Sequence, residues 1–571
     1  MSEYVLSINP CVGNLGSHDP SAVLFENGQL AFGVEEERFT REKHAKNTFP
    51  TNAIEACLEY ADISLSNLKK VLIPWKPSLF YRMLRYDISQ TVTETGDVTE
   101  AITQLEAAVK RDVGPVVYSK QSVRNHLSEF GEYTPPIETV EHHKCHAASA
   151  FHPSGFNEAL IVTLDGRGEY DCTVVWKGNS EGLERVRTYE YPNSLGFFFG
   201  AVTKFLGYYP NNGEGKIMGL APYGDRNDEI EQALREEISI GLDYDVSALS
   251  KGNFEYATRK LEEIFDRPRK QTTDEFSQWE RDLAHVTQKL VEETVTEIVT
   301  HYSDRLSVDK VGLAGGVALN CKVNKEVMEL PGIERTFVQP VSNDAGTAVG
   351  AGFLDAGITA TEDMSTVYWG PEYTTESIES TLKTNKLSYA KPDDLCRTVA
   401  EHIADGKLVG WFQGRLEMGP RALGNRSILA DPRSEASLDR VNEFVKHREG
   451  WRPFAPSMLE HAGDEYLVNF EEAPFMIKTF DVVEEKKAEI PAVLHPADET
   501  TRPQTVREDQ NPRYYDLISA FEDITGVPVV LNTSFNDNGE PIVNQPVEAI
   551  KDFYGMGLDI IVVEDVLIEK S

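Results

Sequence analysis

Short apolar runs separated by polar turns organise the start of the chain. Val5–Asn9 is a predicted strand, and a glycine-rich turn leads from it to His18-Asp19. The apolar runs 22–25 and 30–34 flank Asn27-Gly28, a dipeptide that favours the tight turn of a β-hairpin. The first segment is therefore predicted to contain a strand, a polar turn and a hairpin.

A related series begins about 155 residues further along the chain. The apolar run 159–164 is followed by the turn Asp165-Gly166-Arg167-Gly168. The run 173–176, together with Lys177-Gly178-Asn179, begins a second predicted hairpin. One series repeated along the chain indicates an internal duplication, and two ordinary, unrelated strand–turn segments are the alternative.

Helical spacing of apolar residues predicts a long amphipathic helix between Leu283 and Val299. It leads into a buried strand candidate, Val311–Ala314, which ends in Gly315-Gly316. Residues 340–352 have the pattern of a strand end, a polar loop and the small-residue start of a helix. The first half of the chain is therefore predicted to be α/β.

A polar segment rich in Thr and Glu, 357–388, follows this half. We place a domain boundary near residue 362, which gives predicted domains 1–361 and 362–571. The second domain is again predicted to be α/β. Its clearest elements are strands at 408–412, 527–531 and 560–563 and a helix at 546–554.

Length and charge narrow the class of protein. The 571 residues exceed one ordinary core, and the net charge of −37 disfavours partners such as nucleic acid and anionic membranes. Such a charge is typical of a protein from a high-salt cytoplasm. No apolar run reaches membrane-spanning length, no secretory pattern opens the chain, and the six cysteines form no C-x-x-C pair. We therefore expect a cytoplasmic, halophilic protein with reduced cysteines.

Three histidines within five residues form the first candidate site. His142 and His146 stand at i and i+4, so on a helix they share one face and can bind a divalent metal. Asp344, in the loop after a predicted strand, is the candidate third ligand. The donor set suits iron, manganese or zinc and does not distinguish among them; a purely structural histidine pair is the alternative.

Glycine loops form the second candidate site. Gly213-Glu214-Gly215-Lys216 and Gly315-Gly316 lack the P-loop pattern, but glycines allow backbone N–H groups to approach phosphate. Asn320 follows the second loop, and His18-Asp19 follows the first strand. Together they favour a nucleotide cleft between two similar lobes, although each loop alone is also compatible with an ordinary turn.

Arginine is concentrated in one part of this acidic chain. The segment 413–433 contains Arg415 and Arg421, and Lys446, Arg448 and Arg452 follow closely. Arginine binds phosphate oxygens through two parallel hydrogen bonds. Because these residues alternate with Gly, Pro, Leu, Phe and Ala, they suit a lined cleft better than the alternative, a solvated charged face.

Short polar residues near the C-terminus complete the candidate sites. Asn532 and Ser534 end an apolar strand, and Arg502 lies in a hydroxyl-rich segment upstream. Such residues commonly bind phosphate or ribose at strand ends. Turn formation and helix capping are the alternative explanation.

These motifs together resemble the NodU/CmcH family of O-carbamoyltransferases over nearly the whole chain. The matching segments are Glu35-Glu-Glu-Arg-Phe39, His142-His-x-x-His146-Ala-Ala-Ser-Ala, Glu214-Gly-Lys-Ile-Met-Gly-Leu-Ala-Pro-Tyr-Gly224, Gly315-Gly-Val-Ala-Leu-Asn320, Gly419-Pro-Arg-Ala-Leu-Gly424, Arg452-Pro-Phe-Ala-Pro456 and Asn532-Thr-Ser-Phe-Asn536.

The resemblance implies a TsaD-like N-terminal domain with the duplicated fold of actin and sugar kinases, and a YrdC-like α/β C-terminal domain. It also implies the chemistry. Carbamoyl phosphate and ATP, with Mg²⁺, would give carbamoyl-adenylate in the C-terminal domain. The carbamoyl group would then pass to an acceptor hydroxyl of a sugar, glycan or natural product in the N-terminal domain. A homodimer is the expected assembly.

The same resemblance suggests residue roles. His18 is the candidate base for the acceptor hydroxyl, with Asp19 as the alternative. The basic side chains are expected to neutralise the anionic substrates and to stabilise developing charge. Glu499 departs from the family pattern, because it stands where glycine is expected. The residues assigned to carbamoyl-adenylate formation are Lys446, Arg448, Arg452, Arg415, Arg421, Arg502, Lys216, Asn532 and Ser534, while Gly315, Gly316 and Asn320 are expected to approach the nucleotide.

Two other functions compete with this prediction. One is a tRNA threonylcarbamoyladenosine-type synthase, which the net charge of −37 disfavours. The other is a non-catalytic nucleotide-binding regulator, which the intact set of candidate catalytic residues disfavours. The identity of the acceptor is not encoded in any motif of the chain.

Overall fold

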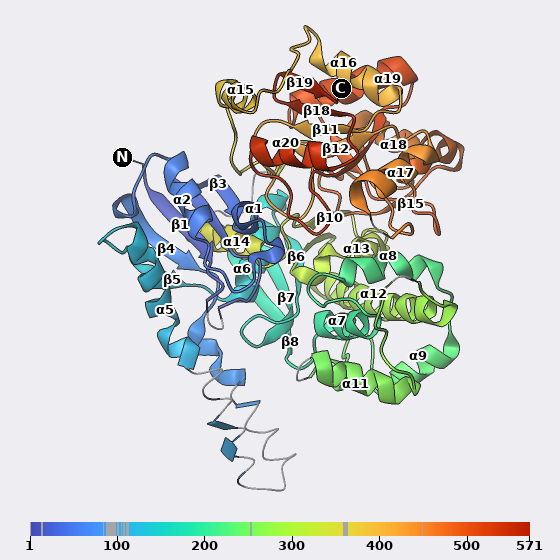
Figure 1. The fold of residues 1–571 in the computed structure, drawn as a ribbon. Coiled ribbons are helices and arrows are strands. Elements are labelled where there is room, and N and C mark those ends of the chain that lie inside the picture. Colours follow the sequence, from blue (N-terminus) through green and yellow to red (C-terminus); the bar gives the residue numbers. More distant parts are fainter. Residues whose placement is uncertain are drawn as a thin grey trace.

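A computed structural model describes residues 2–570, with gaps at 13–14, 252–253, 274, 358–363 and 448 and at most positions between 84 and 113. The predicted boundary near residue 362 lies outside the described residues. A large lower part holds the N-terminal residues, and the C-terminal residues form a separate layer above it (Figure 1).

The first sheet combines a hairpin with two parallel strands. Its strand order is β3-β2-β1-β4-β5, with antiparallel pairing between the first three strands and parallel pairing of β1 with β4 and β4 with β5. The predicted turn at Asn27-Gly28 joins β2 to β3. The strands are β1 (Tyr4–Asn9), β2 (Ser21–Glu26), β3 (Gln29–Glu35), β4 (Leu68–Ile73) and β5 (Ile137–Thr139).

The second sheet repeats this topology. Its order is β10-β9-β6-β7-β8, so that each strand has the neighbours and directions of its counterpart in the first sheet. The predicted internal duplication, and with it the duplicated α/β fold, is therefore confirmed. The strands are β6 (Ala159–Leu164), β7 (Asp171–Asn179), β8 (Gly182–Glu190), β9 (Lys310–Ala314) and β10 (Arg335–Val338).

Two equivalent helices join the duplicated halves. Helix α6 (His142–Phe151) follows β5 and α14 (Ala345–Ala356) follows β10, and the two pack side by side between the sheets (Figure 1). A Cβ atom at Gly350 would lie 1.8 Å from the carbonyl oxygen of Cys145. Only glycine therefore permits this close crossing of the two backbones.

The predicted long helix is α12 (Gln278–Leu306), and a capping box between Ser277 and Glu280 fixes its start. Its apolar stripe is buried in the core of the second half. The other helices of the N-terminal half are α1 (Glu37–Thr40), α2 (Thr51–Tyr60), α5 (Gly114–Leu127), α7 (Leu195–Phe205), α8 (Glu214–Leu220), α9 (Asp228–Arg235), α10 (Ser247–Ser250), α11 (Phe254–Phe265) and α13 (Cys321–Met328).

A seven-stranded sheet of order β16-β13-β17-β12-β11-β18-β19 is the centre of the C-terminal domain. The predicted strands at 408–412, 527–531 and 560–563 all belong to it. Its strands are β11 (Val409–Phe412), β12 (Arg426–Ala430), β13 (Ala455–Leu459), β16 (Gln504–Val506), β17 (Val529–Ser534), β18 (Ile560–Val563) and β19 (Val566–Glu569), beside a small pair β14 (Phe480–Asp481) and β15 (Thr500–Thr501). The helices are α15 (Thr375–Thr384), α16 (Leu395–Ala404), α17 (Glu435–Val441), α18 (Gly463–Tyr466), α19 (Pro512–Thr525) and α20 (Pro546–Gly555).

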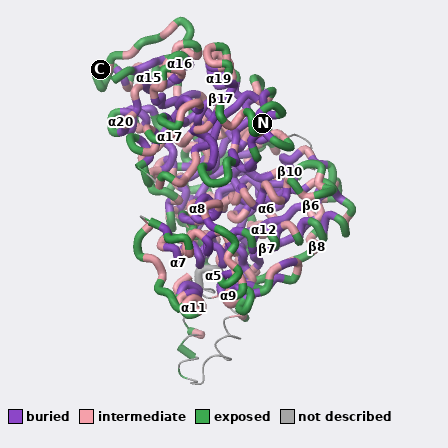
Figure 2. Tube along the Cα trace, turned by 90° about the vertical axis from the view of Figure 1, so that its right-hand side faces the viewer, coloured by how far each residue is buried: buried purple, intermediate pink, exposed green. Residues whose placement is uncertain are grey.

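Buried residues continue from one domain into the other (Figure 2). Met418, Leu423 and Phe475 of the C-terminal domain pack into the core around α12. The domains therefore share an apolar interface, which fixes how their polar residues face one another. Among the described residues, no helix is both long and apolar enough to span a membrane.

Candidate active site

A cavity of about 1270 Å³ lies between the two domains and is lined by residues of both. This volume exceeds the typical range of single small-molecule pockets, so more than one substrate fits. Of the predicted site residues, it brings together His18, Asp19, Lys216, Gly316, Asn320, Asp344, Arg421, Arg452, Arg502, Asn532 and Ser534.

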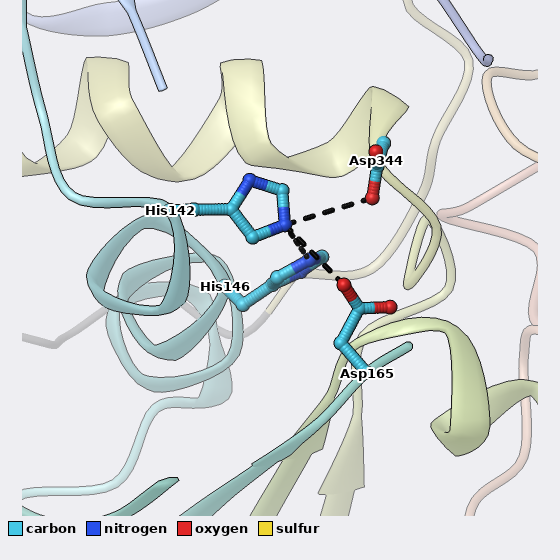
Figure 3. A group of neighbouring side chains, drawn as sticks. All are labelled: His142, His146, Asp165 and Asp344. Atoms are coloured by element: carbon cyan, nitrogen blue, oxygen red, sulfur yellow. Dashed lines mark hydrogen bonds and ion pairs between the residues drawn. The ribbon is translucent and has the colours of Figure 1, made fainter. Parts of the chain in front are cut away.

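A His/Asp cluster, made of His142, His146, Asp165 and Asp344, lies on the N-terminal side (Figure 3), where its two carboxylates line the cavity and its two histidines are fully buried. The two imidazoles come from the first turns of α6, Asp165 follows β6 and Asp344 precedes α14. One ligand atom from each residue lies within 4.8 Å of all the others. His142 Nε2 is 3.1 Å from His146 Nε2, 3.5 Å from Asp165 Oδ2 and 3.6 Å from Asp344 Oδ1.

Surrounding residues orient His142 toward the cluster. Its Nδ1 lies 3.3 Å from the carbonyl oxygen of Pro74, so an Nδ1–H can donate there while Nε2 keeps a lone pair for the centre. The Trp75 ring lies over the imidazole, with 4.0 Å between ring centroids. At the start of α6, the Glu169 carboxylate accepts the backbone N–H of His142 at 3.1 Å.

Charges in the cluster are unbalanced when only protein atoms are considered. Burial raises the pKa of Asp344 to about 6, and the neighbouring Asp165 charge adds to this despite the attraction of His142. Burial would lower the pKa of His142, but the hydrogen bond with Asp165 and the charges of Asp344 and Asp165 raise it to about 9. Burial and the His142 charge lower the pKa of His146. Two buried carboxylates beside two imidazoles are a charge arrangement that a divalent cation satisfies.

The arrangement fits a metal ion. His142 Nε2 lies within 3.6 Å of both carboxylates and of His146 Nε2, so imidazole and carboxylate donors converge on one point. Three members of the cluster were predicted from the sequence, and Asp165 was not. An Asp-Gly pair after a strand indicates a turn, and only the position of Asp165 at the end of β6, next to the start of α6, identifies it as a ligand candidate.

His18 and Asp19 lie beside the cluster at the cavity surface. The Asp19 carboxylate is 3.0 Å from His18 Nδ1 and 2.8 Å from His44 Nδ1. Burial opposes protonation of His18, but the Asp19 hydrogen bond and the charges of Asp344, Asp19 and Asp165 raise its pKa to about 10. His44 was not predicted, because a lone histidine in a charged segment carries no specific signal.

Three arginines gather on the C-terminal side of the cavity. Arg421 and Arg502 have no carboxylate partner among the described residues, whereas Arg452 lies 3.5 Å from Glu449. Burial and the charges of Arg502 and Arg452 lower the pKa of Arg421 to about 9. Arg421 and Arg502, which have no carboxylate partner in the described part of the chain and repel one another, indicate a site for anions in this acidic protein.

Short polar side chains lie beside the arginines at the end of β17. Asn532 donates to Ser457 Oγ at 2.9 Å, and its own buried Oδ1 has no partner among the described residues. Ser534 also lines the cavity. Lys216 reaches in from α8, where it pairs with Glu449 at 3.1 Å.

Four predicted residues have other surroundings. Arg415 donates to the carbonyl oxygens of Gly370, Ala31 and Trp369 and so holds the interdomain segment against β3 instead of lining the cavity. Lys446 Nζ donates to the carbonyl oxygens of Ser534 at 2.6 Å and Asn536 at 2.9 Å, so it supports the end of β17 from behind. Gly315, with a φ of 94°, makes the turn before Gly316 and is not part of the lining. Arg448 lies outside the described residues.

A duplicated α/β domain with a metal-type cluster faces an arginine-lined second domain across one cavity, an arrangement that indicates a two-domain enzyme. Sequence comparison gives the family. The carbamoyltransferase N-terminus family matches residues 12–353 and the carbamoyltransferase C-terminus family matches residues 400–570. The chain belongs to the carbamoyltransferase family.

Named relatives support this assignment over most of the chain. An uncharacterised protein of Synechocystis is 34% identical over 97% of this chain and 95% of its own length. The nodulation protein NolNO of Sinorhizobium fredii is 36% identical over 98% of this chain and 80% of its own. The 3'-hydroxymethylcephem-O-carbamoyltransferase of Amycolatopsis lactamdurans is 30% identical over 75% of this chain and 80% of its own. The predicted resemblance to the NodU/CmcH enzymes is therefore confirmed.

Proposed function

We propose that this carbamoyltransferase is ATP-dependent and acts on a hydroxyl group in two stages within one cavity. On the arginine side, water releases inorganic phosphate from carbamoyl phosphate, and an oxygen of the resulting carbamate displaces pyrophosphate from the α-phosphorus of ATP to give carbamoyl-adenylate. The acceptor hydroxyl then attacks the carbamoyl carbon on the His/Asp side, and AMP leaves. The observation that carries the proposal is the single cavity bordered by both groups of residues.

The arginine side suits the first stage. ATP and carbamoyl phosphate together bring many negative charges, and Arg421, Arg502 and Arg452 converge without enough local carboxylates to balance them. Guanidinium groups held in place before the reaction stabilise charge that develops on the departing pyrophosphate. Asn532, with its unpartnered Oδ1, is placed to accept a hydrogen bond from the nucleotide or the carbamoyl amide.

The His/Asp side suits the second stage. A bound divalent ion, with Fe²⁺ as the first choice and Mn²⁺ or Zn²⁺ as alternatives, would supply Lewis-acid polarisation of the carbamoyl carbonyl. His18 is the proposed base for the acceptor hydroxyl, and Asp19 orients it. Because Asp344 and Asp165 contribute to the raised pKa of His18, cation binding by these carboxylates favours the neutral imidazole that a base requires.

Separate assays of the two stages test the proposal. With ATP and carbamoyl phosphate but no acceptor, the wild type should release pyrophosphate, and Arg421→Ala and Arg502→Ala should release at least tenfold less, about 1.4 kcal/mol in the barrier. His142→Ala should keep pyrophosphate release and lose carbamoyl transfer to acceptors in a cell extract, detected by mass spectrometry.

The exposed Arg226, which pairs with Asp228, offers the matched control. Arg226→Ala should retain both activities. Loss of both activities in His142→Ala would show that the stages are not divided between the two sides of the cavity. Absence of pyrophosphate from the wild type at every salt concentration would exclude the adenylate route.

A further inference from the structure

One part of the cavity has a lining unlike the rest. The aromatic wall, formed by Trp75, Phe80, Tyr191, Phe197 and Phe254, lies next to the loop between Asp165 and β7. Its rings contact one another: Phe197 and Phe254 meet edge to face with centroids 5.5 Å apart, and Trp75 stacks on Phe80 at 6.1 Å. Such a wall binds flat rings or the apolar faces of sugar rings.

Arg167 projects from the same loop into the lining of this part of the cavity. It has no hydrogen bond or ion pair with any described residue, and its guanidinium lies over the Tyr191 ring at 5.7 Å. The neighbouring arginines differ. Arg82 and Arg185 are both paired with Asp171, at 3.1 Å and 2.6 Å. Arg167 is therefore a cation exposed to the cavity in a protein that pairs its nearby arginines.

The position of Arg167 fixes what it can bind. It stands two residues after Asp165, in the N-terminal domain between β6 and β7, whereas Arg421 and Arg502, which the proposed function assigns to ATP and carbamoyl phosphate, belong to the C-terminal domain. An anion on Arg167 thus belongs to the other substrate. A ring between Arg167 and the cluster would rest on the aromatic wall and present a hydroxyl toward His18.

We propose that the acceptor is an anionic, ring-bearing alcohol, whose acidic group pairs with Arg167 and whose ring lies against the aromatic wall. This inference rests on the proposed function, because only that function makes the bound alcohol the acceptor of the carbamoyl group. The predicted binding preference itself does not need ATP or carbamoyl phosphate. Arg167 is therefore the residue that determines specificity for the acceptor. Its pairing with the acid orients the hydroxyl so that its oxygen attacks the carbamoyl carbon while its proton passes to His18.

Two matched probes test the preference. 4-Nitrophenyl β-D-glucuronide and 4-nitrophenyl β-D-glucoside share both rings and differ in a carboxylate against a hydroxymethyl group. Titration followed by saturation-transfer difference NMR should show the wild type binding the glucuronide at least about tenfold more tightly, as expected for a charge-assisted hydrogen bond in a cavity. Arg167→Gln should abolish the preference, and Arg167→Lys should restore most of it.

Controls separate charge from folding and from the aromatic contact. Arg187→Gln removes an arginine that pairs with Asp243 on the outer strand β8 and should keep the preference. Phe197→Ala should weaken both probes alike. Equal affinity for the two probes, binding of neither, or an unchanged preference in Arg167→Gln would overturn the inference. Pyrophosphate release by the wild type, measured separately, decides the proposed function independently of this result.

Discussion

At the scale of single residues, the buried carboxylates of the His/Asp cluster are placed for a cation. Burial raises the pKa of Asp344. Burial opposes ionisation of Asp165 as well, but the hydrogen bond with His142 lowers the pKa of that carboxyl, so His142 compensates one of the two carboxylates and the other is available to a cation. The hydrogen bond of His142 to Pro74 leaves Nε2 directed at the carboxylates. The cluster is thus arranged before any ligand arrives.

Asp165→Asn tests this arrangement. Because the substitution removes one anionic ligand while preserving size, we expect metal content after purification to fall at least about tenfold, which is the range seen even for residues that only support ligands. Inductively coupled plasma mass spectrometry measures it. Asp552→Asn alters a buried carboxylate that does not line the cavity and should leave metal content unchanged. Equal metal content in Asp165→Asn and the wild type would remove Asp165 from the cluster.

The His18–Asp19 pair makes the unfolding free energy depend on pH. In the metal-free protein, the pKa of His18 is raised from 6.5 to about 10. A raised pKa in the folded state stabilises the protein fully below the unfolded value, and this stabilisation is lost as pH rises toward 10. The difference in unfolding free energy between the wild type and Asp19→Asn should therefore be largest near pH 6 and shrink by pH 9.5. Urea unfolding at both pH values in the presence of a chelator measures it, and a difference that grows with pH would contradict the pairing.

Residue types and spacing predicted part of the site. His142 and His146 were recognisable because their i, i+4 spacing already specifies a shared helix face, and Arg421 because arginine is locally concentrated, whereas Arg502 was predicted from its hydroxyl-rich segment. Lys446 and Arg415 were assigned to the substrates for the same reason as Arg421, yet backbone carbonyl groups hold both. The sequence shows that a basic side chain is present, but only the packing shows which group neutralises its charge.

At the scale of elements, helix α6 is positioned by a residue from outside it. Glu169 accepts the N–H groups of His142 and Lys76, at 3.1 Å and 2.6 Å, and so joins the helix start to the segment after β4 and to the loop before β7. Both histidines of the cluster lie in the first turns of this helix. Their placement therefore depends on a carboxylate that contacts no substrate.

Glu169→Ala should reduce the unfolding free energy by about 2 kcal/mol, because it leaves the buried N–H of His142 and the part-buried N–H of Lys76 without an acceptor. It should also lower metal content, while Glu169→Gln, which keeps an acceptor oxygen, should retain most of both. Urea denaturation and metal analysis provide the measurements. The surface pair of Glu158 with Lys177 offers the control, since Glu158→Ala should change stability by less than about 0.5 kcal/mol. A similar small effect of Glu169→Ala would show that α6 does not need this cap.

Elements with strong local signals were predicted well, and those set by packing were not. The Asn27-Gly28 hairpin and α12 appear where their turn and periodicity place them. Lys177-Gly178-Asn179 has turn composition, yet it continues β7, and Gly178 is needed there because a Cβ atom would lie 2.6 Å from the Phe151 ring. That constraint comes from α6, far away in the sequence, and no local pattern contains it. Glu499, expected as glycine, adopts a φ of 54°.

At the scale of the whole molecule, the arginines on one side of the cavity repel one another, and a bound anion would reduce this repulsion. Pyrophosphate should therefore raise the melting temperature of the wild type by several degrees, since a ligand at 100 times its Kd stabilises by about 2.7 kcal/mol. Without anions, Arg502→Gln should melt no lower than the wild type, because it removes one of the charges acting on Arg421. Differential scanning fluorimetry with Arg226→Gln as control measures both, and a full pyrophosphate shift in Arg502→Gln would contradict the site.

The net charge of −37 has a separate effect on the whole surface. Repulsion between like charges destabilises the compact state. In 0.1 M salt, this repulsion is largely screened between charges more than about 10 Å apart. The melting temperature should therefore rise from low to molar KCl. Circular dichroism melting curves in both conditions measure this. Equal stability would count against adaptation to a high-salt cytoplasm.

The repeated strand order has a consequence for the history of the site. Asp19 precedes β2 as Asp165 precedes β7, and the start of α6 corresponds to the start of α14. The four positions around the cluster thus form two equivalent pairs related by the duplication. A symmetric ancestor would have offered the same groups twice across its axis. The present chain has specialised them: one half supplies the histidines and the His18–Asp19 pair, and the other supplies two carboxylates, so that opposite copies of one unit now perform different chemistry.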